Sequence, residues 1–195
     1  MIKQTIARRV LELAGWKIEG DPPTQRRFVL IAAPHTSNWD FPLMLLFATA
    51  FGLKVKWLAK DSLFWPPMGW LMRWMGGIPV VRSRKLNQVD AMRRTFADGK
   101  DLVLVVPTEG TRSLTDRWRS GFYHIARESQ VPIVPSYLDY GKKRGGFGPP
   151  VTPSEDLTAD MDIFRNFYAP MNGKFPELFG PIRLAEEGTD DSKQS

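Results

Sequence analysis

Two short polar segments carry side chains that could do chemistry. His35 and Asp40 belong to PHTSNWD, directly after the apolar run FVLIAA, and Glu109 and Arg112 belong to TEGTRS, directly after the apolar run LVLVVP. A histidine beside a carboxylate can act as a general base, because the carboxylate fixes the ring tautomer and stabilises the protonated ring. An arginine near a glycine turn can bind a phosphate group through two hydrogen bonds. These residues favour proton transfer next to an anionic ligand.

The spacing of His35 and Asp40 limits how the two side chains can meet. Five residues correspond to a rotation of about 140° around a helix axis, so the side chains diverge if one helix holds both. Ser37 and Asp40 fit the S-x-x-D pattern of a helix start with Ser37 as a possible cap, whereas Pro42 favours a slightly later start, and either start leaves His35 outside the helix. We therefore expect His35 in the loop before a helix and Asp40 in its first turn. Taken alone, the pattern also fits a capping carboxylate beside a loop histidine.

The elements that would position these residues alternate along the chain. Continuous apolar runs predict strands covered on both faces, at 27–33, 102–107 and 131–138, with shorter candidates at 55–60 and 78–81. Helices are predicted over 41–52, 87–99 and 120–130, with a further one inside 154–169. This alternation predicts an α/β fold, a single layered domain with a central, mostly parallel or mixed sheet flanked by helices. In such sheets ligands bind beyond the carboxyl ends of strands, where both polar segments lie.

Length, charge and cysteine content narrow the class of protein. A chain of 195 residues suits one domain, and the absence of cysteine excludes a disulfide framework, a thiolate nucleophile and a thiolate metal site. The last eleven residues carry four acids and one lysine, a charge of −3, so the rest of the chain carries +9. A basic surface suits nucleic acid, anionic lipid or a phosphorylated substrate. We expect an amphipathic N-terminal helix (1–20), a main domain (21–184) and a disordered acidic tail (185–195).

Two apolar segments suit contact with a membrane surface. The N-terminal helix is basic and places apolar residues at helical spacing, namely Ile2, Ile6, Val10, Leu13 and Ala14. The run LFWPPMGWLMRWMGG supplies a second set, namely Trp65, Met68, Trp70, Leu71, Trp74 and Met75. Both sets also suit a protein core. No stretch reaches the roughly 18 apolar residues of a spanning helix, and the N-terminus lacks a signal-peptide cleavage pattern. We predict peripheral attachment to an anionic bilayer.

Four ordered blocks of the sequence resemble the glycerolipid acyltransferase family, which includes the 1-acyl-glycerol-3-phosphate acyltransferases. The blocks are PHTSNWD, GWLMRWMGGIPVVRS, VPTEGTRS and VPIVPSY, and they span Phe28 to Tyr137. Two positions depart from the family pattern, Pro34, where asparagine is frequent, and Thr108, where proline is usual. Both departures lie next to presumed functional residues and could alter the acceptor pocket.

The resemblance implies acyl transfer from acyl-CoA or acyl carrier protein to the hydroxyl of a lysolipid. The default acceptor is 1-acyl-glycerol-3-phosphate, which would give phosphatidic acid, and another lysolipid such as a lyso-aminolipid is the alternative. His35 would be the general base and Asp40 would orient it, with no metal and no cofactor beyond the thioester co-substrate. The residues expected at the acceptor site are Arg82, Glu109, Gly110, Thr111, Arg112, Lys60 and Ser37. The reaction would take place at the cytoplasmic face of the cell membrane.

Three other classes of function fit parts of the sequence. A metal-dependent hydrolase could use His35, Asp40 and Glu109 as ligands, although such sites usually recruit more imidazole than two histidines can offer. A non-catalytic lipid-binding protein would explain the basic charge and the tryptophans, but it would leave the two polar segments unexplained. Nucleic-acid binding is disfavoured, because the aromatic residues occur with aliphatic residues and do not alternate with lysine and arginine.

Overall fold

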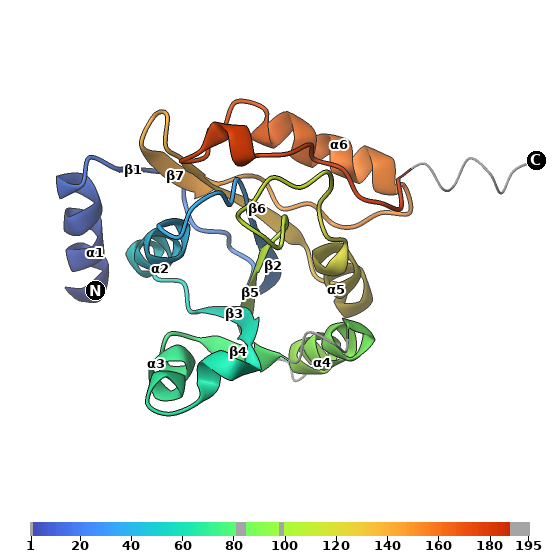
Figure 1. Cartoon of the computed structure of the whole chain (residues 1–195), viewed down its shortest axis with the longest axis horizontal. Helices are drawn as coiled ribbons and strands as arrows, with labels where there is room; N and C mark the ends of the chain where they lie inside the picture. Colours follow the sequence, from blue (N-terminus) through green and yellow to red (C-terminus); the bar gives the residue numbers. More distant parts are fainter. Residues whose placement is uncertain (1, 81–84, 98–99, 188–195) are drawn as a thin grey trace, which may run out of the picture.

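The computed structural model describes residues 2–80, 85–97 and 100–187 (Figure 1). Within these residues the strands form one sheet in the order β1-β7-β6-β2-β5-β3-β4. All neighbouring strands are parallel except β6 and β7. The strands are β1 Lys17–Glu19, β2 Arg27–Ala32, β3 Val55–Lys60, β4 Gly77–Val80, β5 Leu102–Pro107, β6 Ile133–Asp139 and β7 Arg144–Phe147. The predicted mixed sheet is confirmed.

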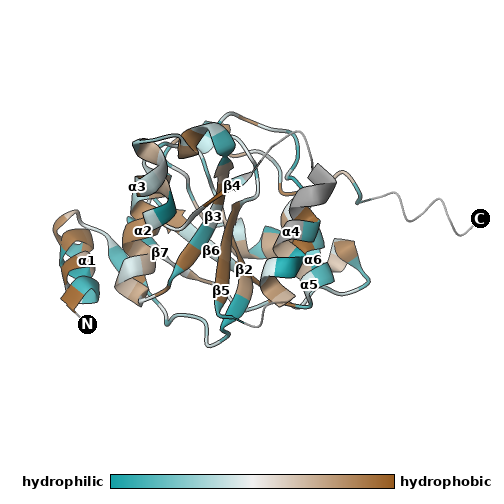
Figure 2. Cartoon of the chain, turned by 90° about the horizontal axis from the view of Figure 1, so that it is seen from below, coloured by the Kyte–Doolittle hydropathy of each residue, from teal (hydrophilic) through white to brown (hydrophobic). Residues whose placement is uncertain are grey.

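Helices cover both faces of this sheet (Figures 1 and 2). The helices are α1 Ile2–Leu13, α2 Asp40–Phe51, α3 Met68–Trp74, α4 Lys85–Ala97, α5 Gly121–Ser129 and α6 Leu157–Tyr168, with short 3-10 turns η1 Asp61–Phe64 and η2 Pro176–Leu178. In both views α1, α2 and α3 lie on one side of the sheet, and α4, α5 and α6 lie on the other. The predicted α/β fold with flanking helices is therefore confirmed.

The two covered faces explain why the central strands are continuously apolar. In β2, Val29 and Ile31 belong to the cluster that α4, α5 and α6 complete, while Phe28 and Leu30 face α2. All four side chains are buried. Because alternate side chains of a strand point to opposite faces, a strand between two helical layers must be apolar at every position.

The N-terminal helix forms, but it ends at Leu13 and not at residue 20, and it packs on the protein through residues outside the apolar stripe. Ala7 and Leu11 are buried against α2, in a cluster with Trp16 and Phe47. The small side chain of Ala7 lets the two helices approach closely. The apolar stripe singled out from the sequence is exposed instead, at Ile2, Ile6, Val10, Leu13 and Ala14. Leu13 has 88% of its surface exposed.

Among the described strands and α-helices, β1, β7 and α3 were not predicted. Helix α3 lies within the tryptophan-rich segment and packs closely on η1, since a Cβ atom at Gly69 would lie 1.9 Å from the carbonyl oxygen of Phe64. Glycine is therefore required at that contact. No helix in the described ranges is long and apolar enough to cross a membrane.

The first three residues of the tail that we predicted to be disordered are folded in the structure. Residues 185–187 form a turn, in which Glu187 accepts hydrogen bonds from the backbone N–H of Leu184 and from Arg165. Residues 188–195 lie outside the described residues.

Candidate active site

The two polar segments meet because β2 and β5 are parallel neighbours. Ala32 pairs with Pro107 at the carboxyl end of the two strands. The loop after β2 carries His35, and the loop after β5 carries Glu109 and Arg112. The expectation that both segments share one edge of the sheet is therefore confirmed.

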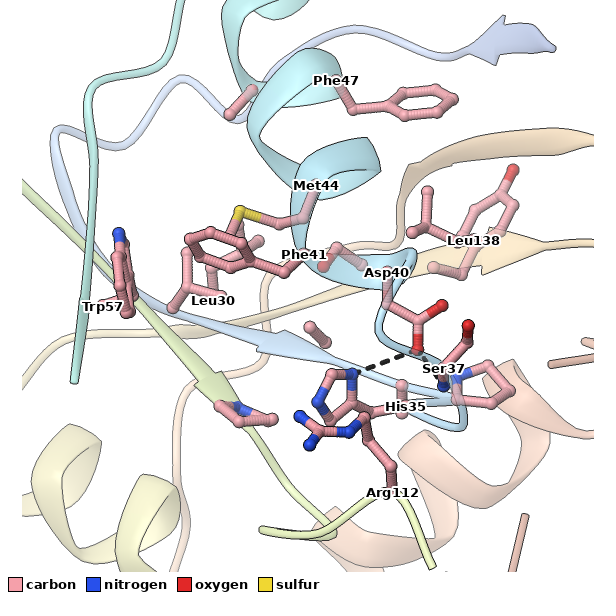
Figure 3. Close-up of a pocket in the computed structure, with 18 of the residues that line it drawn as sticks. Leu30, His35, Ser37, Asp40, Phe41, Met44, Phe47, Trp57, Arg112 and Leu138 are labelled. Atoms are coloured by element: carbon pink, nitrogen blue, oxygen red, sulfur yellow. Dashed lines mark hydrogen bonds and ion pairs between the residues drawn. The ribbon is translucent and has the colours of Figure 1, made fainter. Parts of the chain in front are cut away.

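His35 and Asp40 form a hydrogen-bonded pair at the start of α2. The Nδ1 atom of His35 lies 3.1 Å from Oδ2 of Asp40 (Figure 3). His35 lies in the loop and Asp40 is the first residue of α2, as the spacing predicted. When Nδ1 carries the ring proton and donates it to Asp40, Nε2 keeps a free lone pair. The pair is therefore arranged for His35 to accept a proton at Nε2.

Ser37 holds the loop and is not the N-cap of α2. Trp39 occupies the cap position, and no side chain caps the helix there. The backbone N–H of Ser37 donates to Oδ2 of Asp40 at 2.9 Å, and Ser37 Oγ accepts from the backbone N–H of Trp39. Asp40 thus closes a tight turn that brings its carboxylate within hydrogen-bond distance of the His35 ring. The contact resembles one half of a capping box, in which a carboxylate binds the backbone N–H three residues earlier, but here it lies ahead of the N-cap.

A third partner of Asp40 was not predicted. The hydroxyl of Tyr140 donates to Oδ1 of Asp40 at 2.7 Å. Tyr140 directly follows β6, the strand that lies next to β2 on the side opposite β5. The rule that sites follow strand ends, applied to this third apolar run, would have directed attention to it.

Glu109 supports the backbone of His35 and is not among the residues that line the cavity. Both of its carboxylate oxygens accept from the backbone N–H of His35, at 3.1 and 3.3 Å. Only 2% of Glu109 is exposed. Burial raises the pKa of Glu109 to about 7, although the hydrogen bond from His35 lowers it. Glu109 was grouped with the acceptor-site residues, and in the structure its carboxyl group faces the backbone of the His35 loop.

A cavity of about 580 Å³ begins at the His35–Asp40 pair and extends between α2 and the sheet (Figure 3). One face of α2 lines it, with Phe41, Met44, Phe47, Ala48 and Phe51. These residues follow the i, i+3, i+4 spacing of a single helix face. The sheet and its loops contribute the opposite wall, mainly Leu30, Leu53, Trp57, Val105, Leu138 and Phe147. The site therefore combines a polar end with a long apolar interior.

Comparisons with known proteins identify the family. A family model described as "Acyltransferase" matches residues 16–139, more than half of the chain. The chain belongs to the glycerolipid acyltransferase family. The matched region runs from the residue before β1 to the end of β6 and contains both loops of the site.

Several curated relatives of this acyltransferase-family chain are named 1-acyl-sn-glycerol-3-phosphate acyltransferases. A 1-acyl-sn-glycerol-3-phosphate acyltransferase of Limnanthes douglasii is 30% identical over 63% of this chain and 44% of its own length. A chloroplastic one of Brassica napus, BAT2, is 33% identical over 53% and 32%, and the human alpha form is 30% identical over 71% and 54%. The chain spans less than half the length of the first two relatives.

A solved structure has the same fold. It is the 1-acyl-sn-glycerophosphate (LPA) acyltransferase PlsC of Thermotoga maritima, with a TM-score of 0.58 and 20% sequence identity. The match covers 84% of this chain and 73% of that chain.

Most of the other residues predicted for the acceptor site line the same cavity. These residues are Ser37, Lys60, Gly110, Thr111 and Arg112. Arg112 is exposed and lies beside the His35 ring (Figure 3). Arg82, predicted from the second block, lies outside the described residues.

Glycine at position 110 lets the loop after β5 turn tightly. Gly110 has a φ of +66°, and a Cβ atom there would lie 2.2 Å from Nε of Arg119. Arg119 is therefore a further cation at this loop, and the four blocks do not include it. The second histidine, His124, is exposed on α5 and lies 3.7 Å from Glu186.

The metal-dependent hydrolase considered above would need His35, Asp40 and Glu109 as metal ligands. In the part of the chain that the structure describes, no three His, Asp or Glu side chains are grouped so that they could hold a metal ion.

Proposed function

We propose that this protein transfers an acyl group from acyl-CoA or acyl carrier protein to the hydroxyl of a lysolipid, with 1-acyl-glycerol-3-phosphate as the first acceptor to test. One observation carries the proposal: the His35–Asp40 pair lies at the polar end of a cavity whose interior is apolar. A general base at the mouth of an apolar cavity suits a substrate with a reactive polar end and a long hydrocarbon chain.

The reaction follows from the contacts of His35. Nε2 takes the proton of the acceptor hydroxyl as its oxygen attacks the thioester carbonyl carbon. The carbon–sulfur bond then breaks, the new carbon–oxygen ester bond remains, and the proton held by His35 passes to the leaving sulfur. Asp40 stabilises the positive ring between these steps, because its carboxylate accepts from Nδ1. The products are the acylated lipid and a free thiol.

The loop after β5 is suited to an anionic headgroup. Arg112 can bind a phosphate through two hydrogen bonds, and it lies beside His35 at the cavity. Lys60 adds a second cation to the lining. These side chains favour a phosphorylated acceptor over an uncharged lysolipid.

The apolar interior is proposed to hold the acyl chain. The cavity follows α2 from Asp40 to Phe51, and eleven residues of helix correspond to about 16 Å. Ala48 lines the cavity about 12 Å from Asp40 along the helix axis. A larger side chain at this position would shorten the space for the acyl chain.

Ala48→Phe is therefore expected to change the chain-length preference. We expect kcat/KM for long-chain acyl donors to fall about tenfold, while medium-chain donors keep their kcat/KM, because discrimination by a hydrophobic pocket is worth 10- to 200-fold. Thr49→Phe adds the same ring at the next, exposed position and should leave the preference unchanged. An equal loss for all donors in Ala48→Phe would argue against the cavity as the acyl site.

The protein is proposed to bind the surface of an anionic membrane through α1 and α3, at the cytoplasmic face of the cell membrane where acyl thioesters are available. Both helices lie on the same side of the molecule (Figures 1 and 2), and the exposed apolar residues of the α3 region are Trp65, Met68, Trp70, Leu71 and Trp74. Met75 is half-buried. Leu63 and Met72 lie in the same region and line the cavity, which gives a lipid chain an apolar path from the bilayer.

Two pairs of substitutions test this surface. Wild-type protein is expected to float with anionic vesicles at low salt. The double variant Trp70→Ser with Trp74→Ser, and the double variant Ile6→Ser with Leu13→Ser, should each bind the vesicles at least tenfold more weakly. The reason is that each apolar side chain contributes about 1.5–3 kcal/mol when buried. Ile163→Ser is the control, because Ile163 is exposed on α6 at the other side of the sheet. Failure of the wild type to float, or an equal loss in the control, would count against the surface.

The experiment that tests the function is a product assay. Purified protein is incubated with vesicles, acyl-CoA or acyl carrier protein, and a panel of lysolipids, and diacyl products are measured by mass spectrometry. We expect product with 1-acyl-glycerol-3-phosphate. Product from a different lysolipid alone would move the assignment to that acceptor, and product from none would favour a non-catalytic lipid-binding protein.

A further inference from the structure

Asp40 has three polar partners, and one of them lies far away in the sequence. Its Oδ2 atom accepts from the backbone N–H of Ser37 and faces Nδ1 of His35, whereas Oδ1 accepts from the hydroxyl of Tyr140. Asp40 is only 5% exposed. Each carboxylate oxygen therefore has its own partner, and the plane of the carboxylate is defined from both sides.

The ring of Tyr140 is itself fixed in place. It packs edge to face on Trp16, with ring centroids 5.0 Å apart, and its backbone N–H donates to the carbonyl of Asn172. Trp16 is buried and packs in turn on Phe47. The hydroxyl thus reaches Asp40 from a rigid position, and rigid support is what an orienting contact requires.

Tyr140 is a hydrogen-bond donor in this arrangement. Burial and the contact with the Asp40 carboxylate both raise the pKa of Tyr140 above its ordinary value. The phenol therefore keeps its proton at neutral pH and can donate to a carboxylate but not accept from it.

We propose that Tyr140 is a positioning residue for acyl transfer: its hydroxyl holds Oδ1 of Asp40 so that Oδ2 faces His35 and selects the Nδ1–H tautomer of the ring. The proposal rests on the proposed function, because the free lone pair on Nε2 matters only if His35 accepts a proton. Without the hydroxyl, Oδ1 loses the donor shown here and the carboxylate is free to rotate away from Nδ1.

The same chain offers a matched control. Tyr123 donates to Oδ2 of Asp160 at 2.8 Å, again a tyrosine hydroxyl on a buried carboxylate. Tyr123 lies on α5, and neither it nor Asp160 lines the cavity. Removing this hydroxyl deletes the equivalent hydrogen bond, together with one to the backbone carbonyl of Ser154, away from the site, so any general effect on stability is measured separately.

The kinetic test compares Tyr140→Phe with Tyr123→Phe at temperatures where both variants are folded. We expect kcat of Tyr140→Phe to fall about tenfold with KM unchanged, by analogy with partners that orient metal-ligating histidines, and kcat of Tyr123→Phe to stay at the wild-type value. Adding Tyr140→Phe to a His35→Ala variant should cause no further loss, since the hydroxyl acts through His35. Unchanged kcat in Tyr140→Phe, or an additive loss in the double variant, would overturn the proposal.

A second measurement does not depend on activity. The chain has only two histidines, so the side-chain ¹⁵N signals of His35 can be followed with exposed His124 as the internal reference. We expect the Nδ1–H tautomer of His35 in the wild type and a mixture with the Nε2–H tautomer in Tyr140→Phe. An identical tautomer in both proteins would refute the role of Tyr140. If Tyr140→Phe changes the tautomer in this way but the wild type forms no product, the proposed function is refuted and the positioning of His35 by Tyr140 is not.

Discussion

Replacing His35 with alanine is expected to lower kcat for acyl transfer by about 10²- to 10⁴-fold, the range that general-base catalysis contributes. The side chain removed is the one whose Nδ1 atom binds Asp40 and whose ring lines the cavity. KM for both substrates should change little, because Arg112 and the apolar lining remain in place. Diacyl product formed per minute, measured by mass spectrometry over a range of substrate concentrations, checks both expectations.

The second histidine supplies the control for this prediction. His124 is exposed on α5 and is not part of the cavity lining, so His124→Ala should retain the wild-type kcat. A His35→Ala variant that keeps more than half of the wild-type rate would rule out His35 as the base. An equal loss in both histidine variants would point to a general effect on folding instead.

The sheet and one half of the site were predictable because they depend on local pattern. Strands with a helical layer on each side must be apolar throughout, and this rule located β2, β5 and β6. Chemistry at strand ends then singled out His35 and Arg112. The turn from Ser37 to Asp40 was also local, and it placed His35 outside the helix as expected.

The strand-end rule could point to Glu109 and Tyr140, but it could not say which residue each one contacts, because the contacts depend on the order of strands in the sheet. Glu109 reaches His35 across 74 residues and Tyr140 reaches Asp40 across 100 residues. Both contacts exist only because β5 and β6 lie on either side of β2. Local spacing carries no information about that order.

The face on which a helix packs was also beyond the sequence pattern. In α1 the sequence left open whether the larger apolar stripe packs on the core or faces a membrane, and the structure buries Ala7 and Leu11 and exposes Ile6 and Leu13. This helix therefore carries apolar residues on two faces, and only the face with Ala7 and Leu11 packs on the protein. Hydrophobic spacing alone counts the residues of both faces together.

Glu109 gives the second large prediction, which concerns stability. Its pKa is about 7 in the folded protein, against an ordinary value of 4.5. Below the lower value Glu109 is protonated in both the folded and unfolded states, and above the higher value it is ionised in both. Between them only the folded state holds the proton, so the free energy of unfolding falls as the pH rises through this window. This difference between the two pKa values corresponds to a loss of about 3 kcal/mol in the free energy of unfolding across the window.

Glu109→Gln should remove this dependence, because an amide does not ionise but can still accept from the backbone N–H of His35. In urea unfolding we expect the variant to differ little from the wild type near about pH 5 and to be more stable near about pH 8, by up to about 3 kcal/mol. Glu128→Gln, at an exposed position of α5, is the control and should show no pH-dependent difference. If the difference between Glu109→Gln and the wild type is the same at both pH values, Glu109 does not keep its proton in the folded state, and the buried carboxylate must be stabilised by donors beyond His35.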